Sequence, residues 1–283
     1  MSNDDHAQFI NDQYESGAAK AKTERSKLER MASIIQGLLD GAEQAAKRGD
    51  EAARDEALAK AAALQLKYAI EDAMLAKAGN ESAEEIVSAD FCRESNTPLI
   101  KAKRELIAGL ADLYRGRAIL MGEWQPRKDG KGSKLNRRAY VRVFAHEGDL
   151  RFINQLYTSL ILQMQTMMAA DEDKYCSYVE GIQAWRVSYA YGWVRRVYTR
   201  LKEAGQRNEA AAETGTPGTA LVLRDRTALV NDHVAAQVGK VGKAGYRRDD
   251  NSEAGRRAGQ AAAERADLGG KKVQATQTRQ LNG

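Results

Sequence analysis

Residues 150–168, LRFINQLYTSLILQMQTMM, decide the fold of this chain. Apolar side chains recur in this stretch every three or four residues, which is the period of one face of an α-helix. These side chains are Phe152, Ile153, Leu156, Tyr157, Leu160, Ile161, Met164, Met167 and Met168. We therefore predict a central core helix that ends near residues 171–173, with the rest of the chain packed around it.

Two short runs of strand character precede this helix. Residues 117–121 form the first run, and residues 139–144 alternate apolar and polar side chains as a half-buried strand does. Between them, residues 125–138 are rich in Lys, Arg, Gly and Ser. A loop of this length is more often functional or disordered than structural. The pattern predicts a β-hairpin with a long, flexible, cationic loop.

Helical patterns lie on both sides of this region. Residues 28–39 and 57–75 predict a helical hairpin, and Pro98 starts a further helix. A long helix over 179–203 carries Trp185, Tyr189 and Trp193 on one face, which we interpret as a core or subunit-interface stripe.

Two more patterns follow toward the C-terminus. Residues 221–238 predict a strand fragment or helix start followed by a helix. In a predicted helix over 252–268, Ala254, Ala258, Ala262 and Ala266 permit close approach to another helix.

Together these patterns predict a mainly α protein with a small antiparallel β-hairpin or sheet (α+β) and an N-terminal helical hairpin. The predicted parts are a disordered start (1–21), a helical hairpin module (22–78), an acidic linker (79–96), an α+β body (97–239) and a basic tail with a short helix (240–283).

Composition narrows the class of protein. The chain has 283 residues, of which 43% are hydrophobic and only 6% aromatic, a mix that suits closely packed helices. Cys92 and Cys176 are too far apart in sequence for a local metal motif, so we expect free thiols in a reducing compartment. The start of the chain is polar and no apolar run approaches the length of a membrane span. We expect a cytoplasmic protein with no membrane partner.

Charge is distributed unevenly along the chain. Residues 113–144 hold nine Lys/Arg against two Asp/Glu, whereas residues 1–100 hold twelve against nineteen. Residues 240–283 hold ten Lys/Arg against five Asp/Glu. This distribution predicts an anionic partner for the hairpin and the tail.

The hairpin supplies the candidate binding residues. Lys and Arg in a flexible loop can neutralise phosphates, and flanking aromatic rings can stack on bases. The candidate nucleic-acid-binding residues are Arg127, Lys128, Lys131, Lys134, Arg137, Arg138, Trp124 and Tyr140. The alternative is that Trp124 and Tyr140 are core or cross-strand residues and that the loop is merely soluble. Residues 130–134, GKGSK, lack the spacing and the following helix of a phosphate-binding loop.

Catalytic patterns are weak. The histidines are His6, His146 and His233, and none has a partner at metal-ligand spacing. His146 precedes Glu147 and Asp149, so it is either a general base or a turn residue beside a helix cap. We expect no catalytic residues, no metal and no cofactor, and we keep an unrecognised hydrolase centred on His146 as an alternative.

Six segments, taken in order, resemble a known family. They are residues 27–39, 57–61, 68–75, 157–163, 185–189 and 263–269. Their combination is similar to the longer actinobacterial members of the domain of unknown function 2786 family, which occur in hosts, phages and mobile elements. The resemblance covers residues 27–270 and departs from the family in a longer turn at 42–55. It implies a helical architecture and supplies no activity and no catalytic residues.

These observations lead to two functional hypotheses. The first is a non-enzymatic, nucleic-acid-associated accessory protein of a phage or mobile element, which uses the cationic loop and the basic tail on phosphates with low sequence specificity. The second is a protein-interaction or assembly module, whose acidic helical hairpin and aromatic helix form contacts while the loop meets an acidic protein. Homo-oligomerisation is compatible with either hypothesis.

Overall fold

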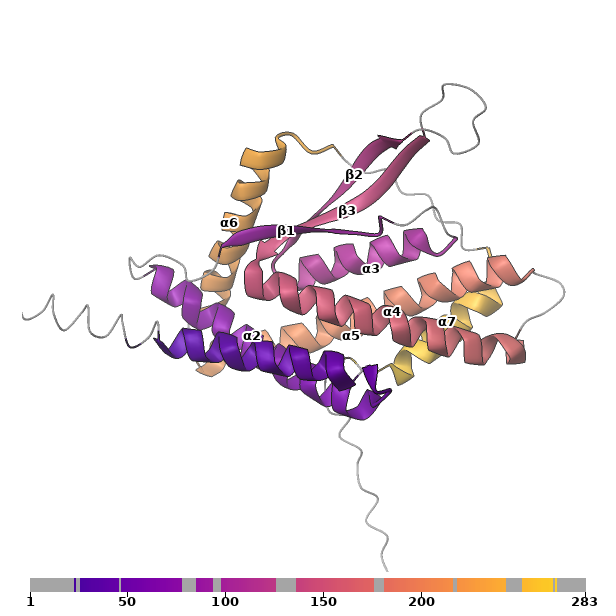
Figure 1. Cartoon of the computed structure of the whole chain (residues 1–283), viewed down its shortest axis with the longest axis horizontal. Helices are drawn as coiled ribbons and strands as arrows, with labels where there is room; N and C mark the ends of the chain where they lie inside the picture. Colours follow the sequence, from indigo (N-terminus) through magenta and orange to yellow (C-terminus); the bar gives the residue numbers. More distant parts are fainter. Residues whose placement is uncertain are drawn as a thin grey trace, which may run out of the picture.

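The computed structural model describes residues 23, 26–45, 47–77, 85–93, 98–125, 136–175, 181–215, 218–242, 251–266 and 268. A first helix over 26–45 is followed by the elements labelled in Figure 1. They are α2 (Glu51–Lys77), β1 (Ile86–Phe91), α3 (Ile100–Leu113), β2 (Arg117–Gln125), β3 (Asn136–His146), α4 (Glu147–Tyr175), α5 (Ile182–Gly215), α6 (Thr219–Val238) and α7 (Glu253–Arg265). The predicted class, mainly α with a small antiparallel sheet, is confirmed.

The sheet has three antiparallel strands in the order β1-β3-β2. Its edge strand β1 lies inside residues 79–96, so the prediction of a linker is wrong for residues 86–91. The strand pairs with β3 from Ile86↔His146 to Phe91↔Val141. Its side chains include β-branched and aromatic residues, which favour strands, and the acidic residues just before it hid this pattern.

The central helix α4 forms the middle of the core, as predicted. Its buried side chains include Phe152, Ile153, Leu156, Leu160 and Met164. The helix continues past the predicted end near residues 171–173 to Tyr175. Asp171 does not end the helix because its buried carboxylate accepts hydrogen bonds from Tyr189 Oη at 3.2 Å and from Arg265 Nη2 at 3.0 Å.

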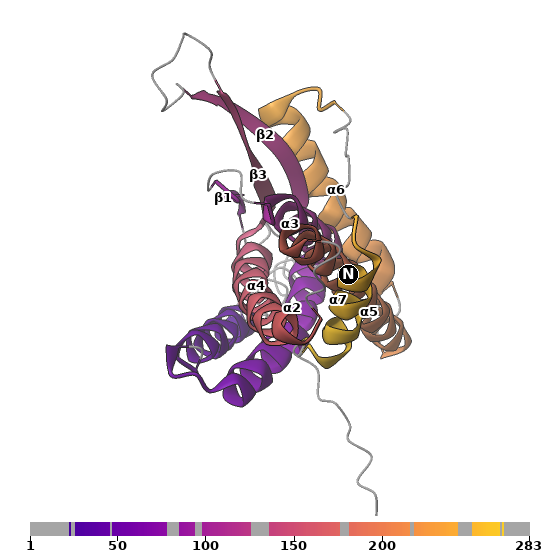
Figure 2. The same ribbon diagram turned by 90° about the vertical axis from the view of Figure 1, so that its right-hand side faces the viewer.

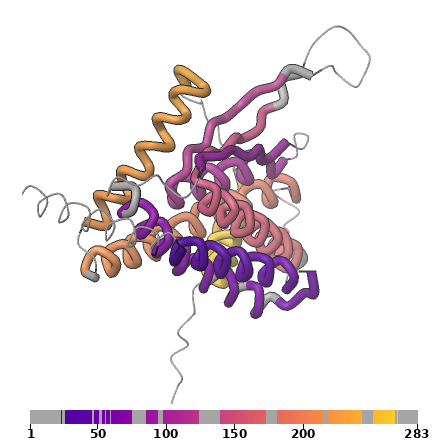
Figure 3. The backbone as a smooth tube through the Cα atoms, turned by 60° about the vertical axis from the view of Figure 1, so that its left-hand side comes forward, coloured from indigo at the N-terminus to yellow at the C-terminus, as the bar shows by residue number. Residues whose placement is uncertain are grey.

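The N-terminal helical hairpin forms as predicted, from the first helix and α2. Its turn contains Gly49, whose φ of 72° is in the region that favours glycine, and Asp50, whose carboxylate accepts from Ala53 N at 3.0 Å. Leu28 and Leu39 belong to the same hydrophobic cluster as the α4 core. The hairpin is therefore continuous with the body. It lies on the opposite side of the molecule from the β2–β3 hairpin (Figure 3).

Helix α7 packs closely against α5. A Cβ atom added at Gly255 or Gly259 would collide with backbone atoms of Trp185 or Tyr189, so these helices approach as only glycine allows. The predicted close approach is confirmed, but Gly255 and Gly259 line the contact, while Ala254 is exposed. The body thus extends beyond its predicted end at residue 239.

Residues 219–238 form one continuous helix, α6, which replaces the predicted strand fragment. Val230 and Val234 on α6 pack against Ile119 and Phe144 of the sheet. In the described part of the chain, no helix combines the length and the apolar character needed to cross a membrane.

Candidate nucleic-acid interface

The β2–β3 hairpin extends away from the helical body (Figures 1 and 2). Strand pairing continues from Arg117↔Phe144 to Gln125↔Asn136. Strand β1 ends its pairing at Val141, so the hairpin is two-stranded beyond that point. We call the five pairs from Met121↔Tyr140 to Gln125↔Asn136 the arm.

The predicted binding residues divide into three groups by position. Arg127, Lys128, Lys131 and Lys134 lie outside the described residues, in the segment that joins β2 to β3. Trp124, Arg137 and Arg138 lie on the paired backbone of the arm. Tyr140 lies at its base and is only 9% exposed. The burial of Tyr140 favours its alternative interpretation as a cross-strand residue, opposite Met121.

Two arginines cover the ring of Tyr140 and belong to a polar cluster, which we call the arm-base cluster. The guanidinium carbon of Arg93 lies 4.3 Å from the ring centroid, and that of Arg142 lies 5.7 Å from it. Arg142 donates two hydrogen bonds to Asp90, at 2.6 and 2.9 Å. Arg93 also donates to Asp90, and its Nη1 lies 3.7 Å from a carboxylate oxygen of Glu123. The cluster therefore links β1, β3 and β2 at the base of the arm.

The charges of the arm-base cluster balance one another. Hydrogen bonds from Arg142 and Arg93 outweigh the effect of burial and hold the pKa of Asp90 below its ordinary value. The same contacts raise the pKa values of Arg93 and Arg142. Two arginines thus meet two carboxylates, Asp90 and Glu123. These arginines are suited to orienting the arm rather than to adding net positive charge.

Asp90 and Arg93 were not predicted as site residues, because both lie in the segment 79–96 that was predicted to be a linker. The run from Ile86 to Phe91 is a usable strand signal, since its six residues include Ile, Val and Phe. Had this strand been recognised, its polar position Asp90 would have been the natural partner for an arginine on a neighbouring strand.

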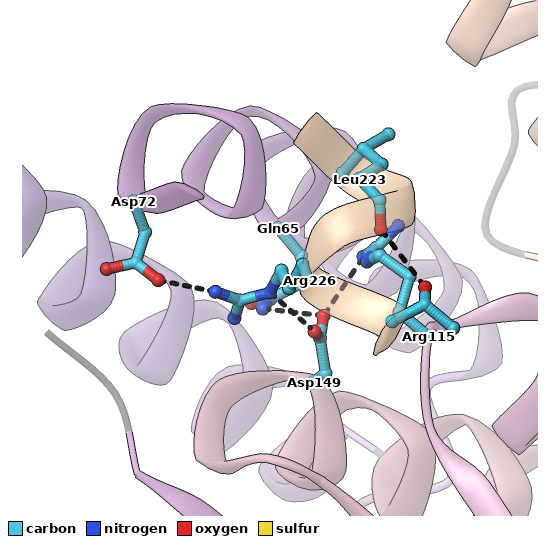
Figure 4. A network of polar contacts seen from close by, with 7 residues as sticks. Gln65, Asp72, Arg115, Asp149, Leu223 and Arg226 are labelled. Carbon is cyan, nitrogen blue, oxygen red and sulfur yellow. Dashed lines mark hydrogen bonds and ion pairs between the residues drawn. The ribbon is translucent and has the colours of Figure 1, made fainter. Parts of the chain in front are cut away.

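A second, buried polar network lies between α2, α4 and α6 (Figure 4). Asp149, in the first turn of α4, accepts hydrogen bonds from Arg115 Nη2 at 3.0 Å, Gln65 Nε2 at 3.1 Å and Arg226 Nε at 3.3 Å. Arg226 also contacts the carboxylate of Asp72. Each of the four charged side chains is at most 7% exposed. The network ties together α2, α4, α6 and the turn that leads into β2.

Arg115 reaches this network from a strained position. It lies between α3 and β2 with a φ of 61°, a conformation that is uncommon for residues other than glycine. Its side chain is held by Asp149, so the ion pair fixes the turn from which the hairpin begins.

The geometry disfavours a general-base role for the group around His146. Burial raises the pKa of Asp149, but the charges of Arg115 and Arg226 outweigh this effect and the pKa is lowered overall. Asp149 is thus an ionised ion-pair partner with little tendency to accept a proton. Glu147 is exposed and contacts Arg151, while His146 is buried at 2% exposure.

A cavity of about 870 Å³ lies between α2, the α3–β2 turn, α5 and the end of α7. Its walls carry six cationic side chains, Arg115, Arg196, Arg200, Lys202, Arg207 and Arg265. Several of them are engaged by other groups. Arg115, Arg196 and Arg265 pair with carboxylates, and Arg200 donates to the carbonyl of Ala266 at 2.9 Å. The cavity is therefore a weaker candidate than the arm for binding an anion.

The aromatic stripe on α5 is part of the core. Trp185, Tyr189 and Trp193 are at most 2% exposed, which confirms the core interpretation. The proposal that this helix forms a contact surface is wrong for these residues, because packing against α7 and α4 buries them. Cys92 is buried, with its Sγ 3.2 Å from Tyr157 Oη, and Cys176 lies outside the described residues.

Within the described ranges, no three His, Cys, Asp or Glu side chains gather in a way that could hold a metal ion. Comparisons of the chain with protein-family models, curated proteins and solved structures found no match. The resemblance to the domain of unknown function 2786 family therefore stays a prediction.

Proposed function

We propose that this protein binds nucleic acid through the cationic end of the β2–β3 arm, with low sequence specificity and without catalysing a reaction. The observation that carries the proposal is the position of the arm. It extends from the body. The start of β3 and the segment that joins it to β2, residues 126–138 together, contain six Lys/Arg and one Asp. Cations in such a position can reach a phosphate backbone and release its counterions.

The pairing of charges at the arm base supports this assignment. Asp90 and Glu123 neutralise Arg93 and Arg142, so the excess positive charge of the hairpin lies farther along it. The six cations concerned are Arg127, Lys128, Lys131, Lys134, Arg137 and Arg138. The arm-base cluster supports the arm, and different residues carry the binding charge. The cations can therefore contact phosphates without a conformational change in the body.

The proposed contribution of the tail is narrower than expected. Within α7, Arg256 and Arg257 contact Glu253, and Arg265 contacts Asp171. If the tail strengthens nucleic-acid binding, the cations that do so are therefore those outside this helix.

The test is binding to labelled DNA and RNA, single- and double-stranded, across a salt series. The variant changes Arg127, Lys128, Lys131 and Lys134 to Ala. On B-DNA, each lost phosphate contact should make the slope of log K against log salt shallower by about 0.9, so the full change is up to about 4. Binding should also be weaker than wild type at every salt concentration.

The matched control removes four exposed cations from the body, Lys47, Lys60, Lys67 and Arg257, which form helix-surface ion pairs. We expect its salt slope to equal that of the wild type. If both four-residue variants lost the same amount of nucleic-acid affinity, net charge and not the arm would drive binding. Absence of binding at low salt would overturn the proposal.

The alternative is a protein-contact role for the N-terminal helical hairpin. The first 100 residues carry an excess of acidic side chains, and Ile34 on the first helix is 54% exposed. Self-association that persists at high salt, measured by light scattering, would favour this role. An association with a phage or mobile element rests on the family resemblance alone.

A further inference from the structure

We infer that the two-stranded arm enters the major groove of duplex DNA. This inference deepens the proposed nucleic-acid binding and rests on it. It concerns the described strands themselves, from Met121 to Gln125 and from Asn136 to Tyr140, and names B-form duplex DNA as the ligand class.

The arm has the dimensions of a groove-binding ribbon. At about 3.4 Å per residue, the four steps from Met121 to Gln125 span about 14 Å. The major groove of B-DNA is about 8.5 Å deep and about 12 Å wide, and it admits a two-stranded ribbon. Three of these steps, about 10 Å, lie beyond the pair Gly122↔Ala139, where Arg104 of α3 contacts the arm. The arm can therefore reach the floor of the groove before α3 meets the phosphates.

The arm also narrows beyond its base. The pair Gly122↔Ala139 carries the smallest side chains of the arm, and Gly122 is exposed. At this level β1 no longer pairs with the ribbon, because its pairing ends at Val141. Two long side chains of the body still reach the arm: Arg104 of α3 donates to the carbonyl of Ala139, and Arg93 lies 3.7 Å from Glu123. The groove walls can thus close around the arm beyond the contact of Arg104 with Ala139.

The base holds the arm in a fixed direction. An isolated two-stranded hairpin is only marginally stable in water. Here the arm-base cluster ties Asp90, Arg142 and Arg93 to Glu123 across three strands. Ile119 and Phe144 anchor the same strands on α6. The arm therefore does not need to be ordered by its ligand.

Shape separates duplex DNA from other nucleic acids. The major groove of A-form RNA is too narrow and deep to be read by side chains, and a single strand has no groove. If phosphate charge alone determined binding, DNA and RNA duplexes of equal length would bind similarly. Groove entry predicts a preference for the DNA duplex.

The first experiment compares a 20-base-pair DNA duplex, an RNA duplex of the same sequence and the DNA single strand at one salt concentration. We expect the DNA duplex to bind at least about tenfold more tightly than the RNA duplex. Dimethyl sulfate then probes the saturated DNA complex. Guanine N7 lies in the major groove and adenine N3 in the minor groove. We expect protection of N7 and no protection of N3.

A shortened arm tests the reach directly. Deleting Trp124 and Gln125 together with Asn136 and Arg137 removes two pairs, about 7 Å, and keeps the alternation of the strands. Arg137→Ala is the control for the lost charge. Arg137→Ala removes one proposed phosphate contact, so it should bind both duplexes more weakly. The shortened variant should lose N7 protection and the preference for DNA, while Arg137→Ala at saturation keeps both. Circular dichroism and thermal unfolding confirm that each variant is folded.

The outcomes separate the two proposals. No binding to any of the three ligands would overturn both the proposed function and this inference. Equal binding to the DNA and RNA duplexes without N7 protection would leave the phosphate-binding function standing and overturn groove entry. Protection of adenine N3 alone would assign the arm to the minor groove and also contradict this inference.

Discussion

The helical body and the β2–β3 arm use charged side chains in opposite ways. In the body, Asp149 is fully buried and balanced by Arg115 and Arg226, so its charge holds secondary structure elements together. Along the hairpin, the paired charges that the structure describes lie at the base, and the sequence of residues 126–138 carries an excess of cations. The difference indicates that folding uses the balanced charges, whereas the unbalanced ones are available to a partner.

The largest expected effect on stability comes from Asp149→Asn, which tests the structural role of the buried charges. The change leaves Arg115 and Arg226 without their shared carboxylate in a buried site, which we expect to lower the free energy of unfolding by about 3–5 kcal/mol. Urea unfolding at pH 7 measures the loss. Nucleic-acid affinity of the folded fraction should be unchanged. A loss below about 1 kcal/mol would show that the network is not a structural clamp.

The α5–α7 contact gives the next largest effect. Gly259→Ala places a Cβ against the backbone of Tyr189, which cannot rotate away, so we expect a loss of about 2–3 kcal/mol. The same substitution at Gly205, which has open space around its Cβ position, is the matched control. It should stabilise α5 by about 0.5–1 kcal/mol through helix propensity. Thermal unfolding should therefore show shifts of opposite sign.

The pH dependence of the free energy of unfolding tests whether ionised Asp149 stabilises the folded state. Its pKa is lowered in the folded state, so its contribution is complete above the unfolded value of about 3.9 and is lost as the pH falls through the folded pKa. We expect no contribution to the slope between pH 7 and 5. Below pH 4 the slope reaches at most about 1.4 kcal/mol per pH unit. Urea unfolding should show a shallower acid slope in Asp149→Asn than in the wild type.

The smallest effect on stability is expected at the arm base. Asp90→Asn removes a partly exposed ion-pair partner and should cost about 1 kcal/mol or less. It also releases the charges of Arg93 and Arg142, so nucleic acid should bind more tightly, by less than about tenfold. Fluorescence anisotropy at two salt concentrations measures this change. Weaker binding would show that the orientation of the arm matters more than its charge.

Local patterns in the sequence account for much of the fold. The period of residues 150–168 predicted α4, and the alternation at 139–144 predicted part of β3. Strand β1 was missed because it is short and follows a run of acidic residues. The close packing of α7 was predicted from its alanines. In the structure, Gly255 and Gly259 are the residues that allow α7 to approach α5 closely.

The polar clusters were harder to predict because their members are distant in sequence. Asp72 and Arg226 are 154 positions apart, and no local pattern marks them as partners. The cationic residues of the hairpin were visible in composition, but their support by Asp90 and Arg93 depends on the order of the strands. Charge excess can thus be read from a sequence, whereas charge balance requires the fold.

The central claim is that the body folds without the cationic segment and that binding requires it. The most direct measurement replaces residues 126–135 with Asn-Gly, a two-residue turn suited to joining Gln125 and Asn136. Melting temperature and affinity for a DNA duplex are then measured on the same sample. We predict a melting temperature within about 3 °C of the wild type, which corresponds to about 1 kcal/mol, and loss of binding at physiological salt. Full binding by a folded variant would contradict the claim.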